Sequence, residues 1–410
     1  MVIPKSENGP PHKSTEPQQA SRPRLSLKIG KSKATFSPLL TIGHAVNDTY
    51  GNMLSGLLPV LTVVFSLSYL LAGVVAMVYN ITSSILQPLL GRWFDRTQTT
   101  WLLEAGLVVN CVGMSLVGLS PSYVILLFLI GTAGLGSAAF HPPAFSSVIK
   151  SGAGSKAGAL GIFLSGGNLG FFLGPVAAGI LVSYYGLPGT MLLLPVGLVV
   201  AVLLLKFRKP KVTPETQATE VGGPANIRLV ALLAAITAFR TTTISSVSTF
   251  LPMYFVTRGD TLILATTIAS IWLGVGILGQ LGGGFLSDRI GRRPVIAASL
   301  MLGSLAFYGF LATSSWLSAI LLIASGILIY ANWSVIVAMS SEAAPRHIGT
   351  VSGFMLGFSI GVGGIAALGF GAVADHFGLH YALVFFDAFA LVGGAVALLL
   401  PARILKTTPS

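Results

Sequence analysis

The chain has 410 residues, of which 53% are hydrophobic and only 9% are charged, and its formal net charge is +12. Soluble domains carry roughly 25% charged residues, so this composition excludes a soluble globule and indicates an integral membrane protein. Cys111 is the only cysteine, which excludes a disulfide framework and a cysteine-built metal site.

The first 36 residues are polar and rich in Pro, Ser and Lys, and they contain no apolar core, which predicts a disordered tail. The tail lacks the apolar stretch of a signal peptide. Its Gly30-Lys31-Ser32 does not complete a phosphate-binding loop, because Leu25 stands where the first glycine belongs. We therefore expect no drive by ATP, and no cofactor.

Twelve apolar runs follow, each about 20 residues or longer and therefore able to span the hydrocarbon core of a bilayer. A polar linker, 207–226, separates them into two sets of six. The joints are short, so neighbouring runs must be antiparallel. The predicted spans are 37–65, 68–91, 99–119, 123–149, 156–184, 187–206, 227–256, 262–287, 294–313, 316–341, 348–374 and 379–402.

The basic residues lie at alternate joints. If the N-terminal tail is cytoplasmic, every Lys and Arg except Arg240 and Arg258 falls on the cytoplasmic side, as the positive-inside rule requires. A nucleic-acid-binding surface would need these charges on one soluble face, so we expect no nucleic-acid partner. We predict an all-α polytopic membrane protein with two pseudo-symmetric six-helix bundles and cytoplasmic termini. The predicted segments are 1–36, 37–206, 207–226, 227–403 and 404–410.

A charged loop occurs once in each half. The segment Gly284-Phe-Leu-Ser-Asp288-Arg289-Ile-Gly291-Arg292-Arg293 has a shorter counterpart in Gly91-Arg-Trp-Phe-Asp95-Arg96, at one common offset for Asp and Arg. This repetition indicates an internal duplication. The pattern resembles the loop after the second helix of each half in the major facilitator superfamily. We expect a gating role for Gly91, Asp95, Arg96, Gly284, Asp288, Arg289, Arg292 and Arg293.

The fifth predicted helix contains Gly170-Phe-Phe-Leu-Gly174-Pro175-Val-Ala-Ala178-Gly179. This stretch resembles a glycine- and proline-containing motif of antiporter branches of the same superfamily, with Ala178 in place of one glycine. Physically, it predicts a smooth, kinked helix against which neighbours can slide. We therefore add Gly170, Gly174 and Pro175 to the residues with a conformational role.

Few ionisable residues lie inside the predicted spans, where they are costly and usually face a cavity or a partner. His44, Asp48, Gly51 and Ser55 share one face of the first helix. Asp48 lies near the midplane, and Arg240 lies at similar depth in the seventh helix. We expect both to face a central cavity and to contact substrate or proton. The alternative is a structural ion pair that locks the halves together.

Further polar residues have two interpretations each. His141 lies in Phe140-His141-Pro142-Pro143, where proline kinks the helix, and is either a titrating group or structural. Asn80 and Gln87 either line the cavity or join helices by hydrogen bonds. Glu342 either pairs with Arg289 or is an unpaired surface charge. The six histidines are scattered along the chain, so no metal site is predicted.

The first half carries a closer resemblance, to the fosmidomycin-resistance family within that superfamily. The matching pieces are Gly43-His44-Ala-Val-Asn47-Asp48, Gln87-Pro88, Phe140-His141-Pro142 and Gly166-Gly167-Asn168-Leu-Gly170; Pro143 stands where that family usually has Glu. The resemblance implies export of small drugs, including anionic phosphonates, in exchange for protons. The complete set of expected substrate- or proton-binding residues is His44, Asn47, Asp48, Asn80, Gln87, His141, Asn168 and Arg240.

We therefore predict a monomeric, proton-coupled efflux antiporter of the plasma membrane, which works by alternating access and is not an enzyme. Its partners are a small-molecule substrate, protons and the lipid bilayer. One alternative is an organic anion/proton symporter, since protonation of Asp48 would free Arg240 to hold an anion. Another is a membrane sensor without flux, although such proteins usually carry an added soluble domain and this chain has only a short tail and linker.

Overall fold

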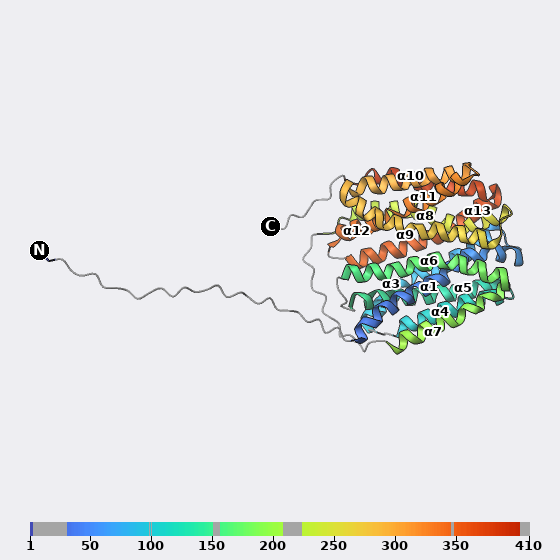
Figure 1. The fold of residues 1–410 in the computed structure, drawn as a ribbon, viewed down its shortest axis with the longest axis horizontal. Helices are drawn as coiled ribbons and strands as arrows, with labels where there is room; N and C mark the ends of the chain where they lie inside the picture. The colour runs from blue at the N-terminus through green and yellow to red at the C-terminus, as the bar shows by residue number, and fades with distance from the viewer. Residues whose placement is uncertain are drawn as a thin grey trace.

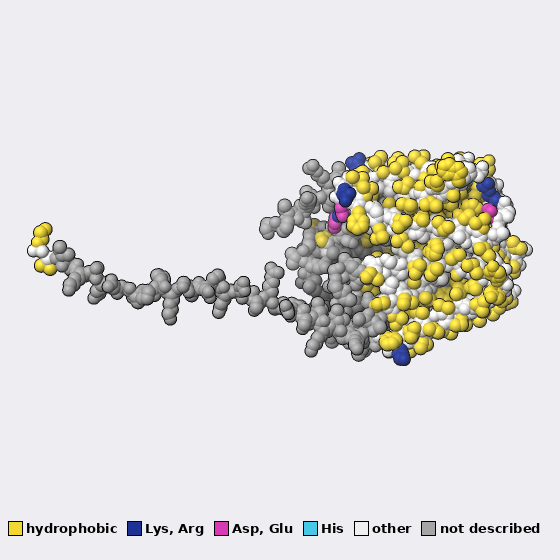
Figure 2. All heavy atoms as spheres, viewed as in Figure 1, with side chains coloured by type: hydrophobic (Ala, Val, Ile, Leu, Met, Phe, Trp, Pro, Cys, Tyr) yellow, Lys and Arg dark blue, Asp and Glu magenta, His cyan; other side chains and the backbone are white. Residues whose placement is uncertain are grey.

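The structure is a computed structural model that describes residues 1–2, 31–97, 99, 101–150, 156–207, 224–345 and 348–401. Apart from the short joints, the described segments from residue 31 onward are helical, and the helices run along one common direction (Figure 1). Figure 2 shows apolar side chains over the flank of this bundle and charged side chains at its two ends. This distribution suits a bundle that crosses a bilayer, where charged groups are costly at mid-depth.

The first half begins with α1 at Lys31, inside the range that the sequence assigned to the tail. The second predicted span of this half, 68–91, is divided at Leu86 into two helices. The division falls just before Gln87-Pro88, because proline removes a backbone donor and disturbs the preceding turn. The elements of this half are α1 (Lys31–Val64), α2 (Tyr69–Ile85), α3 (Gln87–Thr97), α4 (Trp101–Leu116), η1 (Val117–Leu119), α5 (Tyr123–Lys150), α6 (Lys156–Tyr185), η2 (Leu187–Leu193) and α7 (Leu194–Lys206).

In the second half the last helix is broken at Gly378, which has φ 81° and ψ 161°. Only glycine adopts such a conformation without a steric cost, and the break falls between the two last predicted spans. The elements of this half are α8 (Ile227–Thr257), α9 (Leu262–Ile290), α10 (Arg292–Ala312), α11 (Trp316–Tyr330), α12 (Trp333–Ala343) and α13 (Ile348–Ala397).

Ten helical segments of the described chain are long and apolar enough to cross a membrane. One of them, Gly353–Ala397, contains the break at Gly378, and α1 is not among the ten. The chain is therefore a multi-pass membrane protein.

Side-chain caps explain why the joints between helices are so short. The side chains of Ser68, Thr261 and Ser315 each accept a hydrogen bond from a backbone N–H in the first turn of the following helix. Such caps satisfy donors that a helix start leaves unpaired. A joint of a few residues can therefore end one helix and begin the next.

The two halves touch closely at the end of the bundle where α2 and α9 begin. A Cβ atom on Gly73 of α2 would lie 2.5 Å from the carbonyl oxygen of Ala367 in α13, and one on Gly371 would come closer still to the carbonyl of Tyr69. Gly179 of α6 leaves equally little room beside Thr266 of α9. Small residues allow this backbone approach between membrane helices.

Polar contacts strengthen the same end. The Asp375 carboxylate accepts hydrogen bonds from the backbone N–H groups of Tyr69 (2.7 Å) and Leu70 (2.9 Å), at the start of α2. The Val176 N–H donates to the Ser270 hydroxyl oxygen (3.0 Å). We call this region the closed end; it comprises 69–73, 176–179, 266–270 and 367–375.

The charged loop of the second half lies at the opposite end of α9. Asp288 and Arg289 are exposed in the last turn of α9, and Arg293 lies in the first turn of α10. Glu342 forms a two-pronged ion pair with Arg292, in which Nη2 lies 2.6 Å from Oε1. The predicted pair of Glu342 with Arg289 is therefore wrong.

Gly291 separates Arg292, the observed partner of Glu342, from Arg289, the predicted one. It has φ 95° and turns the chain between α9 and α10, a conformation that favours glycine. Arg292 then starts α10 and contacts Glu342, whereas Arg289 remains on α9. Gly284 lies one turn before Asp288, with Ser334 of α12 beside it.

The first-half copy of the loop belongs to α3. A Cβ atom on Gly91 would lie 3.6 Å from Pro142, so α3 lies against α5 at this point. The side chain of Arg96 is exposed. The side chain of Asp95 lies outside the described part of the chain.

Candidate functional site

A cavity of about 330 Å³ lies between the two halves. This volume is near the lower limit of the 300–1,000 Å³ typical of small-molecule sites. Helices of both halves contribute to its wall, including α1, α2, α5 and α6 on one side and α8, α9, α12 and α13 on the other. Seven of the eight predicted binding residues line it: His44, Asp48, Asn80, Gln87, His141, Asn168 and Arg240.

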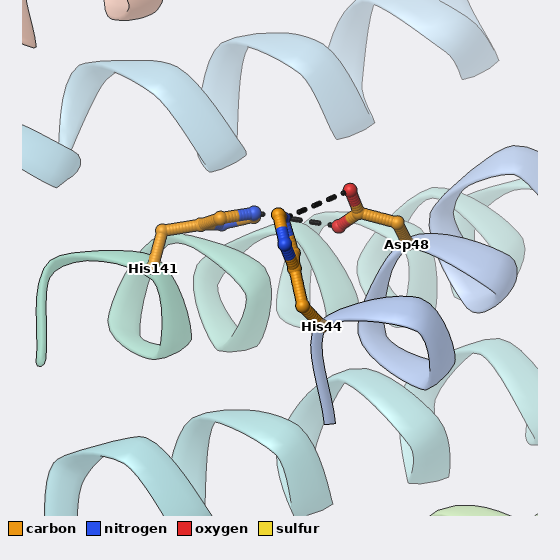
Figure 3. Close-up of side chains that lie close together, drawn as sticks. All are labelled: His44, Asp48 and His141. Carbon is orange, nitrogen blue, oxygen red and sulfur yellow. Dashed lines mark ion pairs between the residues drawn. The ribbon is translucent and has the colours of Figure 1, made fainter. Parts of the chain in front are cut away.

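The first-half wall carries a cluster of His44, Asp48 and His141 (Figure 3). His44 Nε2 lies 3.3 Å from Asp48 Oδ2, one helical turn away on α1. His141 Nε2 from α5 lies 3.3 Å from the other carboxylate oxygen, Oδ1. Both imidazoles therefore turn the same ring nitrogen toward one carboxylate.

The other ring nitrogen of each histidine is held by the backbone. His44 Nδ1 lies 2.8 Å from the carbonyl oxygen of Phe163, and His141 Nδ1 lies 2.9 Å from that of Ser137. A carbonyl oxygen can only accept, so Nδ1 carries the hydrogen in both rings. In a neutral imidazole, Nε2 then has a free lone pair that faces Asp48.

Asn47 does not line the cavity, contrary to the prediction. It is fully buried, and its Nδ2 donates to Asp48 Oδ1 (3.0 Å) and to the Ser137 hydroxyl (3.3 Å). Asn110 of α4 donates to Asn47 Oδ1 (2.9 Å) in turn. Asn47 thus orients the carboxylate from behind. Sequence reasoning missed Asn110, although an amide inside an apolar span was a usable signal.

Glycines bring α6 against this cluster. A Cβ atom on Gly167 would lie 2.6 Å from His44 Cε1 and 2.8 Å from Asp48 Oδ2. Gly170 and Gly174 leave similarly little room beside Ala45 and Thr49 of α1. The predicted conformational residues Gly170 and Gly174 therefore pack α6 on α1 within one half. Pro175 directly precedes Val176, which contacts α9 of the other half.

The second-half wall is built around Arg240 of α8. This side chain is buried, with a residue exposure of 5%, and its guanidinium carbon lies 4.9 Å from the ring centre of Trp333 and 5.4 Å from that of Tyr330. Aromatic faces attract a cation but do not neutralise it. Arg240 Nε has no hydrogen-bond partner. Sequence reasoning did not identify Tyr330, because nothing in its spacing marks it as a neighbour of Arg240.

No ion pair joins Asp48 and Arg240, and no described carboxylate lies within ion-pair distance of Arg240. The alternative of a structural ion pair that locks the halves is therefore wrong. Gln87 Nε2 is a second buried donor without a partner on the cavity wall. Two donors that lack acceptors indicate a ligand that supplies acceptors, such as an anion.

Among the residues that the structure describes, His44, Asp48 and His141 form the one group of His, Cys, Asp or Glu side chains that could hold a metal ion. Their ligand atoms all lie within 4.8 Å of one another. The scattered histidine positions did not reveal this group, because distance along the chain does not measure the distance between α1 and α5.

The model of the Major Facilitator Superfamily matches residues 40–284 and 259–409. The chain belongs to the Major Facilitator Superfamily. This membership and the similar proteins below identify a transporter rather than an enzyme.

The relatives support the resemblance to fosmidomycin-resistance transporters. The chain is 28% identical over 381 residues to the fosmidomycin resistance protein of Escherichia coli (strain K12), covering 88% of this chain and 92% of that protein. It is 29% identical over 405 residues to the uncharacterized MFS-type transporter YfnC of Bacillus subtilis (strain 168), covering 92% and 96%.

The fold has solved counterparts. A bacterial homologue of the human lysosomal transporter Spinster, in an inward-facing and occupied conformation, matches with a TM-score of 0.80 and 17% identity over 90% of this chain and 96% of that chain. This likeness shows the fold.

Proposed function

We propose that this protein is a secondary active transporter of the plasma membrane that exports small drug-like compounds or organic anions in exchange for protons. The observation that carries the proposal is the cavity between the halves, with its two unpartnered donors, Arg240 Nε and Gln87 Nε2. Sites near the midplane between two helical repeats are typical of secondary transporters.

The proposal includes twelve membrane crossings. Counting α1, and counting α13 as two helices on either side of Gly378, adds two crossings to the ten segments that satisfy length and composition. With both termini in the cytoplasm, the closed end faces outward and the Arg292–Glu342 pair faces inward. The positions of the basic residues support this orientation.

The substrate class follows from the donors. A small anion fits a buried guanidinium because the anion supplies both the negative charge and the acceptors that the wall lacks. The rings of Tyr330 and Trp333 beside Arg240 offer apolar contact to the rest of such a molecule. A relative named for fosmidomycin resistance supports a phosphonate, and another named a multidrug resistance protein supports a drug-like compound.

Exchange is favoured over symport by the partners of Asp48. The symport alternative required that protonation of Asp48 release Arg240 for the anion. In the structure Asp48 lies beside two histidines, and Arg240 has no acidic partner to be released from. This arrangement therefore does not support the release of Arg240 on which the symport alternative depended.

The transport cycle we propose is a rocking of 37–206 against 227–403. The contacts at the closed end, including the Asp375 carboxylate on the start of α2, must break for the cavity to open there. The glycine contacts between α2 and α13 provide smooth surfaces for this separation.

The test uses proteoliposomes with an acidic lumen and a trapped pH dye. The membrane potential is held at zero with potassium and valinomycin, because it acts on each charge with about 2.3 kcal/mol per 100 mV. Addition of a phosphonate outside should raise the lumen pH, since protons leave as the compound enters. A further fall in lumen pH would establish symport, and no change with any phosphonate, carboxylate or lipophilic cation would contradict proton-coupled transport of these compounds.

A further inference from the structure

We propose that His44, Asp48 and His141 form a binding site for a divalent first-row transition-metal ion, with Zn²⁺ as the best-fitting ion. The site would use Nε2 of both histidines and the carboxylate of Asp48. Imidazole and carboxylate are both common ligands of Zn²⁺. The inference concerns ion binding by the chain and does not depend on the proposed transport.

The spacing of the ligand atoms carries the proposal. Ligand atoms about 2.0–2.1 Å from a tetrahedral ion lie about 3.3 Å from each other. His44 Nε2 lies 3.3 Å from Asp48 Oδ2 and His141 Nε2 lies 3.3 Å from Asp48 Oδ1, so each nitrogen is at this distance from one of the two carboxylate oxygens. A charge-assisted hydrogen bond would be shorter, at about 2.7–2.9 Å. The ligand atoms that the three residues offer all lie within 4.8 Å of one another.

The backbone contacts of the histidines are those of metal ligands. A ligating histidine almost always donates its other ring N–H to a carbonyl, carboxylate or water, which fixes the tautomer. Both histidines do so here, to Phe163 and to Ser137. In the neutral form of each ring, the lone pair required for a metal bond is therefore on Nε2.

The carboxylate is oriented in the same manner. Asn47 donates to Asp48 Oδ1 and is itself held by Asn110, so the carboxylate has a second layer of hydrogen bonds, as ligating carboxylates have. Phe163 stacks on His44 with ring centres 4.2 Å apart. The absence of a side chain on Gly167 allows α6 to pack directly against His44 and Asp48.

Charge also favours a cation at this point. Asp48 has a residue exposure of 8%, and its ion-pair partners among the described residues are His44 and His141, which are positive only when protonated. A buried carboxylate is costly without a positive partner. Because all three residues line the cavity, the fourth position of a tetrahedral ion would face it and remain open to water or an anion, as in zinc sites with three protein ligands.

The test is a titration of the purified full-length protein, after treatment with EDTA, with ZnCl₂ at neutral pH in a calorimeter. We expect one Zn²⁺ per chain and binding about 100-fold weaker, or more, in His141→Ala and Asp48→Asn, since even outer-shell changes cost 10–100-fold. The control is His376→Ala, an exposed histidine next to Asp375, which should bind Zn²⁺ like the wild type.

A second measurement guards against misfolded variants. Co²⁺ bound to the wild type should show the strong visible absorption of a four-coordinate site, and X-ray absorption of the Zn²⁺ form should show two imidazoles. Absence of stoichiometric binding to the wild type would overturn the proposal. Binding that His376→Ala abolishes and that His141→Ala leaves intact would also overturn it, because the ion would then sit at the exposed histidines.

Discussion

The two walls of the cavity differ in their charged groups. On the first-half wall, Nε2 of His44 and of His141 each face the Asp48 carboxylate at 3.3 Å. On the second-half wall, Arg240 is buried beside two aromatic rings, and its Nε has no hydrogen-bond partner. The difference teaches that the two walls suit different ligands. The two proposals assign a cation to the first-half wall and an anion to the second-half wall.

This comparison also gives Asp48 and Arg240 separate roles. The sequence places Asp48 and Arg240 at similar depths in the two halves, which left a structural ion pair between them as the alternative to contact with substrate or proton. The structure instead gives each its own surroundings, and the cavity lies between them. A substrate anion can therefore occupy the Arg240 wall without competing with Asp48 for the guanidinium.

The largest expected effect comes from removing the charge of the second-half wall. In Arg240→Gln, anion binding should weaken by roughly 10- to 150-fold, because a hydrogen bond to a charged group contributes about 1.5–3 kcal/mol. Arg240→Lys should restore part of the loss, since lysine keeps the charge but not the planar fork. Quenching of tryptophan fluorescence by a phosphonate measures the affinity, because Trp333 lies beside Arg240.

The matched control is Arg258→Gln. Arg258 also contacts an aromatic ring, that of Tyr254, but does not line the cavity. The Arg258→Gln variant should leave the affinity for the phosphonate unchanged. Equal losses in both variants would show that general positive charge, rather than the Arg240 wall, attracts the anion.

The closed end offers the next largest effect. In Gly371→Ala the new Cβ meets the backbone carbonyl of Tyr69, which cannot rotate away, and overpacking of this kind costs about 1–3 kcal/mol. The fraction of molecules in which the contacts at the closed end are broken should therefore rise by roughly 5- to 150-fold. Labelling of a Thr249→Cys reporter by an impermeant thiol reagent from the closed-end side measures this rise, since the native Cys111 is buried.

Gly282→Ala is the control for this variant, because nothing lies within 4 Å of a Cβ atom at that helical position. Its labelling rate should equal that of the reporter alone. If Gly371→Ala also leaves the rate unchanged, the close approach of α2 and α13 does not hold the cavity shut.

A smaller effect is expected for Asp375→Asn. The carboxylate accepts two N–H groups at the start of α2, where a negative charge is favourable by about 0.3–1 kcal/mol. The same labelling assay should show an increase of about two- to fivefold. Asp260→Asn, in the joint between α8 and α9 at the same end, should show none; an equal increase there would point to a general charge effect.

The smallest effect is expected at the Arg292–Glu342 pair. Glu342 has a side-chain exposure of 46%, and an exposed ion pair contributes about 0–1 kcal/mol. Glu342→Gln should lower thermal stability slightly, and high salt should remove the difference. A double-mutant cycle with Arg292→Gln measures the coupling, and a value of several kcal/mol would contradict the exposed geometry.

Much of the fold could be predicted, because membrane spans are recognised by their length and apolar composition. The joints and the break near Gly378 were placed within a few residues. On the cavity wall, His44 and Asp48 were predicted together since helical periodicity fixes which residues share a face. The same periodicity places Asn47 about 100° away from Asp48, which explains why it lies behind the carboxylate.

Contacts between helices could not be predicted from one sequence. The meeting of His141 with Asp48 depends on how α5 crosses α1, and the aromatic partners of Arg240 depend on the packing of α11 and α12 against α8. Glu342 pairs with Arg292, which follows the turn at Gly291, and not with Arg289, which precedes it. Spacing along the chain contains none of this information.

The most direct test of the central claim is accumulation of a radiolabelled phosphonate in inside-out membrane vesicles with an acidic lumen. Wild-type protein should concentrate the compound in the lumen, a proton uncoupler should discharge it, and Arg240→Gln should reduce it while Arg258→Gln does not. Accumulation that is indifferent to the proton gradient and to Arg240, or none for any small anion, would contradict the account.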